Sequence, residues 1–458
     1  MHVDVIVIGT GQAGVPLAAR LAEAGRRVVI AERKALGGTC VNYGCTPTKT
    51  MVASAHAAHV ARTAGRLGVK AGTVTVDMAA VVRRKDRIVR QWRDGVRKRL
   101  GKAAPRLTLV RGHARFVGPR RLEIAGERYE AGIVVVDVGA RPAVPPVPGL
   151  DGVPWLDNTR AMRLRRLPAH LLVLGGGYIG CEFAQMFRRF GARVTVVDRA
   201  EHLLATEEPE ASAALEEVFR DEGIRLLLKA TVASVSGGAR AVTLGLDRGR
   251  PVSGSHLLVA VGRRPNTGDL GAEAAGIRLD ANGYIEVDER YRTSAEGVYA
   301  VGDCTPGPQF THAAWDDHRI LFDLLQGRGT RTRNDRLIPI TAFTDPQVAR
   351  IGLTERDARA RGHTPATATM AFGEIARAVE TDQTAGTMKI LLDPQTEKVL
   401  GASIVGAEAG ELIHIFAPVM AAGVSARAIV DGEYVHPTFA EGVQSLVRSL
   451  PRYAMDHG

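Results

Sequence analysis

The sequence predicts an α/β protein with two nucleotide-binding units of one design, because the same strand, turn and helix pattern occurs twice. In each copy a short apolar run, which fits a strand buried on both faces, leads into a glycine-rich turn and then an amphipathic helix. A second apolar strand follows and ends on an acidic residue. One glycine motif alone would be weak support, whereas two complete units predict Rossmann-like dinucleotide-binding folds.

The first unit lies at the N-terminal end of the sequence. Its strand is predicted over residues 3–8, its helix over 15–24 and its second strand over 28–31, and the turn reads GTGQAG. The glycines Gly9, Gly11 and Gly14 permit a tight turn and the close approach of a pyrophosphate to the helix N-terminus. Glu32, at the end of the second strand, can accept hydrogen bonds from ribose hydroxyls.

The second unit repeats this order with strands over 171–174 and 194–197 and a helix over 181–190, and its turn reads GGGYIG. Asp198 follows Gly175 by 23 positions, the spacing that also separates Glu32 from Gly9. Asp198 favours NADH over NADPH, because its carboxylate would bind the ribose 2′-hydroxyl and repel a 2′-phosphate. The neighbouring Arg199 works against that preference.

Two cysteines separated by four residues, Cys40 and Cys45, have the spacing of a redox-active disulfide. Five residues of ideal helix rise roughly 7.5 Å, whereas a disulfide allows roughly 4.4–6.8 Å between Cα atoms, so the segment must depart from a regular helix. Gly44 can permit that departure. Pro47 fits the first turn of a helix that continues over 48–64, and a helix N-terminus favours the thiolate form of a nearby cysteine.

Two other interpretations of the cysteine pair are weaker. A zinc site would need more soft ligands, and the remaining cysteines, Cys181 and Cys304, stand singly in glycine-rich segments and fit buried apolar positions, so we expect no metal site. A structural disulfide is uncommon in the reducing cytosol. We therefore expect a catalytic pair.

The composition indicates a large protein of about three domains, with 458 residues of which 45% are hydrophobic. The first strand begins at once, which leaves no room for a leader, and no apolar run reaches the ~18 residues of a membrane span, so we expect a cytoplasmic protein without membrane contact. The net charge of +11 comes largely from scattered arginines, densest over 83–111. A solvated helix, or mild attraction for anionic cofactors, explains them better than nucleic-acid binding.

Two dinucleotide folds around one redox disulfide suggest one dinucleotide that stays bound and one that exchanges. A flavin and a nicotinamide fit best, because a hydride from NAD(P)H can reach FAD and the reduced flavin can open the disulfide. The expected cofactors are therefore FAD and NAD(P)H, with NADH favoured.

Three further motifs carry a resemblance over the whole chain. They read GVYAVGD at 297–303, GRRPN at 262–266 and HPTFAE at 436–441. With the cysteine pair, they resemble the class I flavoprotein disulfide reductases, the family of dihydrolipoamide dehydrogenase, glutathione reductase and mercuric reductase. The resemblance implies an FAD domain over 1–147 and 265–334, an NAD(P) domain over 148–264, and an α+β dimerisation domain over 335–458 of an obligate homodimer.

The resemblance also implies roles for individual residues. Cys45 would be the thiolate next to the flavin and Cys40 the thiol that attacks the substrate, while Lys49 would pair with Glu182 beside the flavin N5. His436 would act as acid and base in the partner subunit's site, with Glu441 holding its tautomer. Tyr178 would gate the nicotinamide pocket. The implied cofactor contacts are Gly9, Gly11, Gln12, Ala13, Gly14, Glu32, Arg33, Gly38, Thr39, Lys49, Ala114, Gly139, Gly175, Gly177, Tyr178, Ile179, Gly180, Asp198, Arg199, Gly262, Asp303, His312 and Ala313.

Some segments differ from the common dehydrogenase pattern. Residues 137–140 read DVGA in place of an ATG motif, and residues 309–315 read QFTHAAW. These resemble mercuric-reductase-like proteins and the reactive-chlorine resistance branch, although the tail at 449–458 has no cysteine pair. The implied acceptor is a small-molecule disulfide or a soft metal ion, in redox or metal stress defence. The alternatives are dihydrolipoamide dehydrogenase of a lipoyl-dependent complex and a biosynthetic dithiol oxidase or disulfide reductase.

Overall fold

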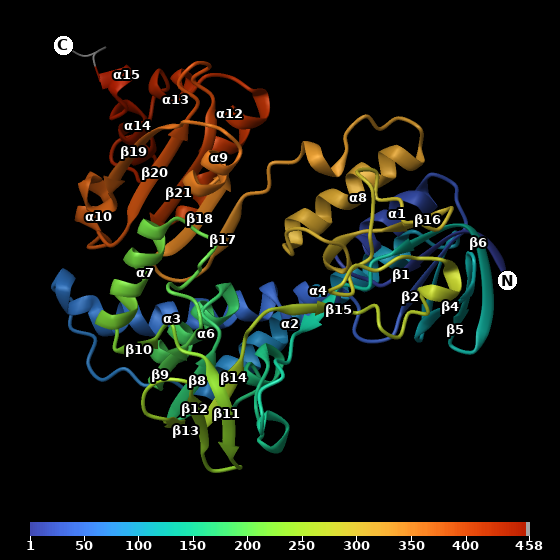
Figure 1. Ribbon diagram of the computed structural model, residues 1–458, viewed down its shortest axis with the longest axis horizontal. Helices are drawn as coiled ribbons and strands as arrows, with labels where there is room; N and C mark the ends of the chain where they lie inside the picture. The colour runs from blue at the N-terminus through green and yellow to red at the C-terminus, as the bar shows by residue number, and fades with distance from the viewer. Residues whose placement is uncertain (455–458) are drawn as a thin grey trace. The chain divides into compact units, whose positions relative to one another are not determined.

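The computed structural model describes residues 1–454 (Figure 1), so positions 455–458 of the cysteine-free tail lie outside the described residues. Within the described part, the chain divides into two compact units. The first contains Met1–Thr50, Val82–Ala143 and Gly262–Arg336, and the second contains Met51–Val81, Val144–Val261 and the chain from Leu337 on. The finer division predicted from the sequence stays a prediction.

The first unit is built on a mixed sheet in the order β3-β2-β1-β6-β5-β4. The strands β1, β2, β3 and β6 run parallel, and β16 pairs in parallel with the carboxyl end of β6. Two short strands, β7 and β15, form a separate antiparallel ribbon. The strands of this unit are β1 (His2–Ile8), β2 (Val28–Glu32), β3 (Leu107–Arg111), β4 (Ala114–Gly118), β5 (Arg121–Ile124), β6 (Glu127–Val136), β7 (Ala140–Pro142), β15 (Arg263–Pro265) and β16 (Val298–Ala300).

The apolar strands of this sheet form because both faces are buried. Along β1, Ile6 and Ile8 belong to one hydrophobic cluster, whereas Val5 and Val7 belong to another that includes residues of α1 and α8. Successive side chains of a strand point to opposite faces, so an unbroken apolar run is what a sheet covered on both sides requires. The predicted strand over 3–8 and helix over 15–24 are confirmed within one residue at each end.

The helices that carry residues of the first unit begin with α1 at the glycine-rich turn. The chain passes from one unit to the other within α3 and again within α4, and α4 carries the arginine clusters that the sequence placed on a helix. The helical segments with residues in this unit are α1 (Gly14–Glu23), α2 (Gly38–Tyr43), α3 (Cys45–Thr63), α4 (Met78–Lys102), η3 (Glu273–Ala275), η4 (Gly302–Cys304), α8 (Thr311–Leu325) and η5 (Arg333–Asp335).

The second unit contains three sheets. A parallel sheet in the order β10-β9-β8-β14 repeats the design of the first unit, an antiparallel sheet β11-β12-β13 lies beside it in the chain, and β17-β18-β21-β20-β19 form the antiparallel C-terminal sheet. The strands are β8 (His170–Leu174), β9 (Arg193–Val197), β10 (Ile224–Leu227), β11 (Val232–Gly237), β12 (Val242–Leu246), β13 (Val252–Gly254), β14 (His256–Val259), β17 (Ile340–Ala342), β18 (Gln347–Gly352), β19 (Ala366–Ala371), β20 (Thr387–Leu392) and β21 (Val399–Gly406).

Helix α6 starts earlier than its predicted first residue, because Gly177 is its N-cap and Tyr178 opens its first turn. Helix α7 contacts β20 and β21, so the nucleotide-binding part and the C-terminal sheet pack within one unit. The helical segments of this unit are η1 (Ala64–Leu67), η2 (Leu150–Gly152), α5 (Asn158–Ala161), α6 (Tyr178–Phe190), α7 (Pro209–Asp221), α9 (Glu355–Ala360), η6 (Phe372–Glu374), α10 (Ala376–Glu380), α11 (Ala409–Leu412), η7 (Ile413–Ile415), α12 (Phe416–Ala422), α13 (Arg427–Val430), α14 (Ala440–Arg448) and α15 (Pro451–Ala454).

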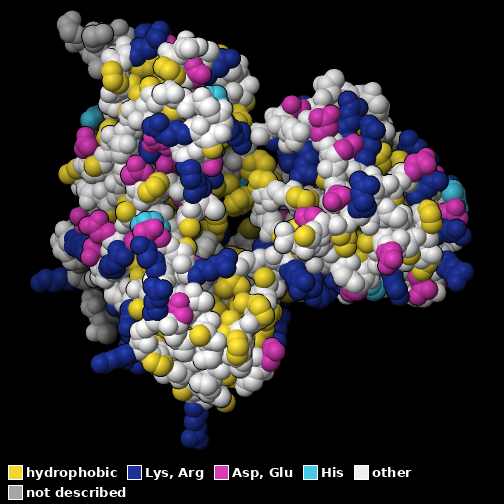
Figure 2. All heavy atoms as spheres, viewed as in Figure 1, with side chains coloured by type: hydrophobic (Ala, Val, Ile, Leu, Met, Phe, Trp, Pro, Cys, Tyr) yellow, Lys and Arg dark blue, Asp and Glu magenta, His cyan; other side chains and the backbone are white. Residues whose placement is uncertain are grey.

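On the face shown in Figure 2, basic and acidic side chains lie side by side. This mixture supports the interpretation of the arginines as solvated surface residues. Among the described residues, no helix combines the length and the apolar character that crossing a membrane requires.

Candidate functional site

The glycine-rich turn of the first unit is a cradle that side chains would fill. Gly9 has φ +109°, and a Cβ added there would lie 2.1 Å from the carbonyl oxygen of Asp137. Gly38, at the start of α2, has φ +62°, and its Cβ would lie 2.8 Å from the Cα of Gly11. Because backbones approach this closely, only glycine fits at these positions. A phosphate group of a bound dinucleotide would lie at the start of α1.

Glu32 stands at the end of β2 beside this turn. Its Oε2 accepts hydrogen bonds from the Thr10 amide at 3.0 Å and the Thr10 hydroxyl at 2.6 Å, and its Oε1 accepts one from the Lys34 amide at 2.6 Å. The carboxylate is therefore fixed at the rim of the turn, where a ribose would follow a pyrophosphate.

Asp303 lies in η4 and forms an ion pair with Arg263, whose Nη2 is 3.1 Å from Asp303 Oδ2. Arg263 Nη2 also donates to the carbonyl of Ala140 at 2.8 Å, while its Nε is buried and makes no hydrogen bond to any described residue. Burial raises the pKa of Asp303, although the positive charge of Arg263 acts in the opposite direction. An orphaned buried donor next to a carboxyl group is a place where an extended polar ligand can bind.

The glycine cradle, Glu32 and the Asp303–Arg263 pair all belong to the first unit and together fit FAD. The other predicted FAD contacts are also in or next to this unit's turns. Ala13 is the N-cap of α1, Ala114 begins β4, and the ring of His312 near the start of α8 lies 5.6 Å from that of Phe310. The remaining ones are Gln12, Gly14, Arg33, Thr39, Lys49, Gly139 and Ala313, with Gly262 (φ +125°) at the return of the chain to this unit.

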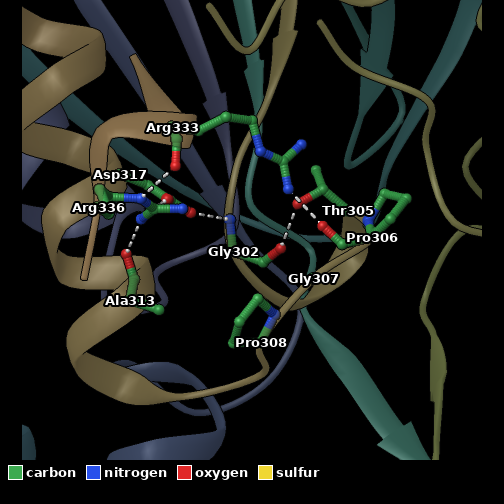
Figure 3. A pocket seen from close by; sticks show the side chains of 9 residues that line it. All are labelled: Gly302, Thr305, Pro306, Gly307, Pro308, Ala313, Asp317, Arg333 and Arg336. Atoms are coloured by element: carbon green, nitrogen blue, oxygen red, sulfur yellow. Dashed lines mark hydrogen bonds and ion pairs between the residues drawn. The ribbon is translucent and has the colours of Figure 1, made fainter. Parts of the chain in front are cut away.

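A small pocket beside η4 shows how this region is supported (Figure 3). Arg336 forms an ion pair with Asp317 at 2.6 Å and donates to the carbonyl of Ala313 at 3.0 Å. Asp317 in turn accepts the amide of Gly302 at 2.7 Å. These bonds tie the start of α8 to η4 and so hold Asp303 in position.

The cysteine pair lies where two helices meet. Cys40 is in α2, Cys45 is the first residue of α3, and Gly44 between them interrupts the helix, as the distance argument predicted. A Cβ on Gly44 would lie only 3.1 Å from the carbonyl oxygen of Thr39. The interaction with Cys45, and then burial, raises the pKa of Cys40.

Two neighbours of this pair were missed by sequence reasoning. The Thr311 hydroxyl, at the first residue of α8, lies 3.1 Å from Cys45 Sγ. Buried Asn42 donates to the carbonyls of Leu36 and Gly38, and its Oδ1 accepts from Arg93 at 2.7 Å. The only signals in the sequence were an amide between the two cysteines and a threonine inside the unusual segment 309–315.

Lys49 lies on α3 one turn beyond Cys45, on the same helix face. Glu182 is 5% exposed on α6, where its Oε1 accepts the amide of Phe343 at 2.9 Å. Because Lys49 belongs to the first unit and Glu182 to the second, their pairing stays a prediction.

The second glycine-rich turn repeats the geometry of the first. Gly175 has φ +110°, and its Cβ would lie 2.4 Å from the Ala260 carbonyl oxygen. A Cβ on Gly180 would lie 1.9 Å from the carbonyl oxygen of Gly175, so helix and strand pack closely. Asp198 accepts the amides of Gly176 at 2.5 Å and Ala200 at 2.7 Å. Of the other predicted contacts, Gly177 and Arg199 are exposed and Ile179 is partly buried.

Tyr178 at the start of α6 is anchored by residues that the sequence did not indicate. Its hydroxyl donates to Glu207 Oε1 at 2.5 Å, and Arg350 Nε donates to Glu207 Oε2 at 2.8 Å. Burial, followed by the charge of Glu207, raises the pKa of Tyr178. Glu207 and Arg350 are far apart in the sequence, which is why no local pattern reveals the pair.

His436 and Glu441 form a contact at the start of α14. The imidazole Nδ1 is 2.9 Å from Glu441 Oε1, and Glu441 Oε2 accepts the amide of Thr438 at 2.9 Å. The hydrogen bond from Thr438, and then that from His436, lowers the pKa of Glu441. The His436 side chain is 71% exposed, so its outer nitrogen is open to a molecule from outside. Cys181 and Cys304 are fully buried, as predicted.

Comparison with known proteins gives matches along nearly the whole chain. The model of the family described as pyridine nucleotide-disulphide oxidoreductase matches residues 3–317, and that of its dimerisation domain matches residues 338–447. The chain is 35% identical to the probable pyridine nucleotide-disulfide oxidoreductase RclA of Escherichia coli, covering 96% of this chain and 98% of that protein. It is 32% identical to a mercuric reductase of Staphylococcus aureus (96% and 81%) and 34% identical to a dihydrolipoyl dehydrogenase of Thermus scotoductus (99% and 98%).

Among solved structures, the Cu(II) complex of the HOCl-induced flavoprotein disulfide reductase RclA from Escherichia coli matches with a TM-score of 0.89 at 33% identity. The match covers 98% of this chain and 99% of that chain. The fold is therefore shared over nearly the whole chain.

Proposed function

Because this chain belongs to the pyridine nucleotide-disulphide oxidoreductase family, whose enzymes use FAD and NAD(P)H, we propose that its redox centre is Cys40–Cys45 and that its acceptor is a disulfide or a soft metal ion. A role in defence against oxidative or metal stress follows from the two kinds of relative named RclA and mercuric reductase.

One observation carries this proposal: the two cysteines meet at the junction of α2 and α3, with Cys45 at the N-terminus of α3. FAD held by the first unit would supply two electrons from NAD(P)H to a neighbouring disulfide. The Cys40–Cys45 bond is the disulfide that would be opened by them. The positive end of the α3 dipole then stabilises a thiolate at Cys45, where the Thr311 hydroxyl is within hydrogen-bond distance.

With a disulfide acceptor, His436 of the partner subunit takes the proton of Cys40, and the Cys40 thiolate attacks one sulfur while the other leaves as a thiolate that needs a proton. His436 of the partner subunit supplies that proton, and Glu441 keeps the imidazole oriented through Nδ1. Cys45 then attacks the sulfur of Cys40, which forms the Cys40–Cys45 disulfide again and releases the second thiolate, which takes a proton from solvent. The exposed position of His436 and the match to a dimerisation domain support a homodimer in which each subunit completes the other.

A soft metal ion suits the same thiol pair, because thiolates are the preferred ligands of soft metals. The relatives named mercuric reductase, and the solved Cu(II) complex of RclA, favour this class of acceptor. A second candidate is dihydrolipoamide oxidation for a lipoyl-carrying complex. It is favoured by the His436–Glu441 pair, which serves thiol–disulfide exchange, and by the Thermus scotoductus relative.

For the nicotinamide, we propose that NADH is preferred. Asp198 follows β9 with its carboxylate held by the amides of Gly176 and Ala200, which supports binding of an unphosphorylated ribose. Like-charge repulsion of about 1–2 kcal/mol against a 2′-phosphate would give roughly 5- to 30-fold higher kcat/KM with NADH. A clear preference for NADPH would show that the attraction of Arg199 for a 2′-phosphate outweighs the repulsion by Asp198.

The acceptor is tested by steady-state kinetics of the FAD-loaded protein with lipoamide, glutathione disulfide, mycothione, Hg(II), Cu(II) and O₂. We expect turnover with at least one soft metal ion or small disulfide well above that with O₂, and its loss in both Cys40→Ser and Cys45→Ser. Turnover that survives both substitutions would contradict the proposed redox centre. Lipoamide as the best acceptor by a large margin would favour the second candidate.

A further inference from the structure

Asp137 is a buried carboxyl group beside the glycine-rich turn of the first unit, at a position where the second unit has an alanine. It follows β6, whose Val136 pairs with Ile8 of β1, just as Ala260 follows β14, whose Val259 pairs with Leu174 of β8. The glycine that opens each turn confirms this equivalence, because its Cβ would meet the carbonyl oxygen of Asp137 in one unit and of Ala260 in the other.

The carboxyl group fills the space that three glycines leave. Its Oδ2 accepts the amide of Gly14 at 2.7 Å. A Cβ on Gly11 would lie 2.6 Å from Oδ2, and one on Gly302 would lie 2.8 Å from Oδ1. An amide at the start of α1, of the kind that faces the pyrophosphate in dinucleotide-binding turns, thus donates to a side chain.

The charges around Asp137 disfavour an anion. Burial raises its pKa well above the ordinary value, against the hydrogen bond from Gly14. Asp303 of η4, Asp317 of α8 and Glu32 of β2 raise it further. The cations nearest these acids are already paired, since Arg263 binds Asp303 at 3.1 Å and Arg336 binds Asp317 at 2.6 Å. Cys304 of η4 and Tyr291, whose hydroxyl donates to Asp317 Oδ1 at 2.9 Å, are further titratable groups of this region, and both are buried.

We propose that Asp137 is an FAD-binding residue that serves as an uncharged carboxylic acid, with Oδ2 accepting from Gly14 and the O–H at Oδ1 donating to the FAD pyrophosphate. This inference rests on the assignment of FAD to the first unit. A carboxylate in the same place would repel the two negative charges of the pyrophosphate, so loss of the proton weakens FAD binding. The second unit, with Ala260, has no such dependence.

The test is FAD retention by the purified holoenzyme as a function of pH, from the flavin that passes an ultrafiltration membrane. The wild-type protein should keep FAD at pH 7 and release it as the pH rises, with the dissociation constant increasing by up to about tenfold per pH unit. Asp137→Asn keeps an acceptor for Gly14 and a donor toward the pyrophosphate but cannot ionise. It should therefore retain FAD at every pH at which the protein stays folded.

The matched control is Asp151→Asn, the same chemical change at an exposed aspartate of the second unit, which should release FAD as the wild type does. Circular dichroism at each pH separates release from unfolding. The inference would be overturned if wild type and Asp137→Asn released FAD with equal pH profiles, or if the wild type held FAD equally well at pH 7 and pH 10. A folded Asp137→Asn protein without FAD at pH 7 would also overturn it. If the folded wild-type protein cannot take up FAD at all, the assignment of FAD to the first unit is itself wrong.

Discussion

At His436, one ring nitrogen is fixed and the rest of the imidazole is exposed. Nδ1 is 2.9 Å from Glu441, whose second oxygen is held by the Thr438 amide. This contact orients the ring and leaves Nε2 exposed. In the proposed mechanism Nε2 exchanges the proton, and disulfide reduction, in which a thiolate leaves, is the reaction that uses it.

We expect His436→Ala to separate disulfide from metal turnover. With a disulfide acceptor the rate should fall on the order of 10²- to 10⁴-fold, in line with the loss of a positioned acid, while flavin reduction by NADH in stopped-flow measurements stays nearly unchanged. Reduction of a soft metal ion, which needs no proton at that step, should fall much less. Equal losses with both acceptors, at unchanged FAD content, would mean that His436 stabilises the thiolates instead.

The residues that the sequence revealed are those whose chemistry depends on near neighbours. The glycine turns, Glu32, Asp198 and the cysteine pair could be predicted because spacing along the chain fixes their geometry. Thr311 and Arg350 could not be predicted, because their partners Cys45 and Glu207 come from distant segments. The sequence showed that Asp137 departs from the usual ATG motif, but the environment of its carboxyl group could be described only from the structure.

Among the elements, β20 contains a buried lysine that joins the C-terminal sheet to the segment before α7. Lys389 Nζ lies 3.1 Å from Glu208, 3.0 Å from Glu210 and 2.8 Å from Glu355, and its side chain is 5% exposed. The Glu208 side chain is 3% exposed, so the lysine is the cation that makes its burial tolerable. Periodicity predicted the strands and helices next to the two glycine-rich turns to within about three residues, whereas this network joins residues about 180 positions apart.

Lys389→Met should therefore lower the stability of the second unit by about 3–5 kcal/mol, because it leaves a buried carboxylate without its cation. Thermal unfolding followed by circular dichroism should show a lower Tm. Glu208→Gln in the same chain should recover part of the loss. Lys398→Met, at an exposed lysine, serves as the control and should change stability by less than about 0.5 kcal/mol. A double variant no more stable than Lys389→Met would contradict the stated cause.

At the scale of the whole molecule, the proposed homodimer combines the cysteines of one chain with His436 of the other in each active site. Mixed dimers of two variants test this arrangement. If His436 serves the cysteines of the other subunit, a mixed dimer of Cys40→Ser and His436→Ala chains contains one complete site and one with both defects. Random pairing makes half of the dimers mixed, so co-expression should restore about a quarter of wild-type disulfide reductase activity.

The control for this experiment is a mixture of the two variants purified separately and combined without exchange of subunits, which should stay inactive. If His436 instead serves its own chain, every site in every dimer has one defect, and co-expression should restore nothing. Tagging one chain and isolating the mixed dimer would raise the recovery to about half of the wild-type activity per dimer.

The first unit is assembled from three stretches of chain, and this affects the order of events on the ribosome. The glycine-rich turn is translated early, but β16, which pairs with β6, and Asp303 follow only after Val144–Val261 of the second unit has been made. Domains usually fold as units in the order of their synthesis. Here the nucleotide-binding part of the second unit can fold while the first still lacks a strand, so a nascent chain acquires its flavin late, and a chain that stops before β16 should never hold it.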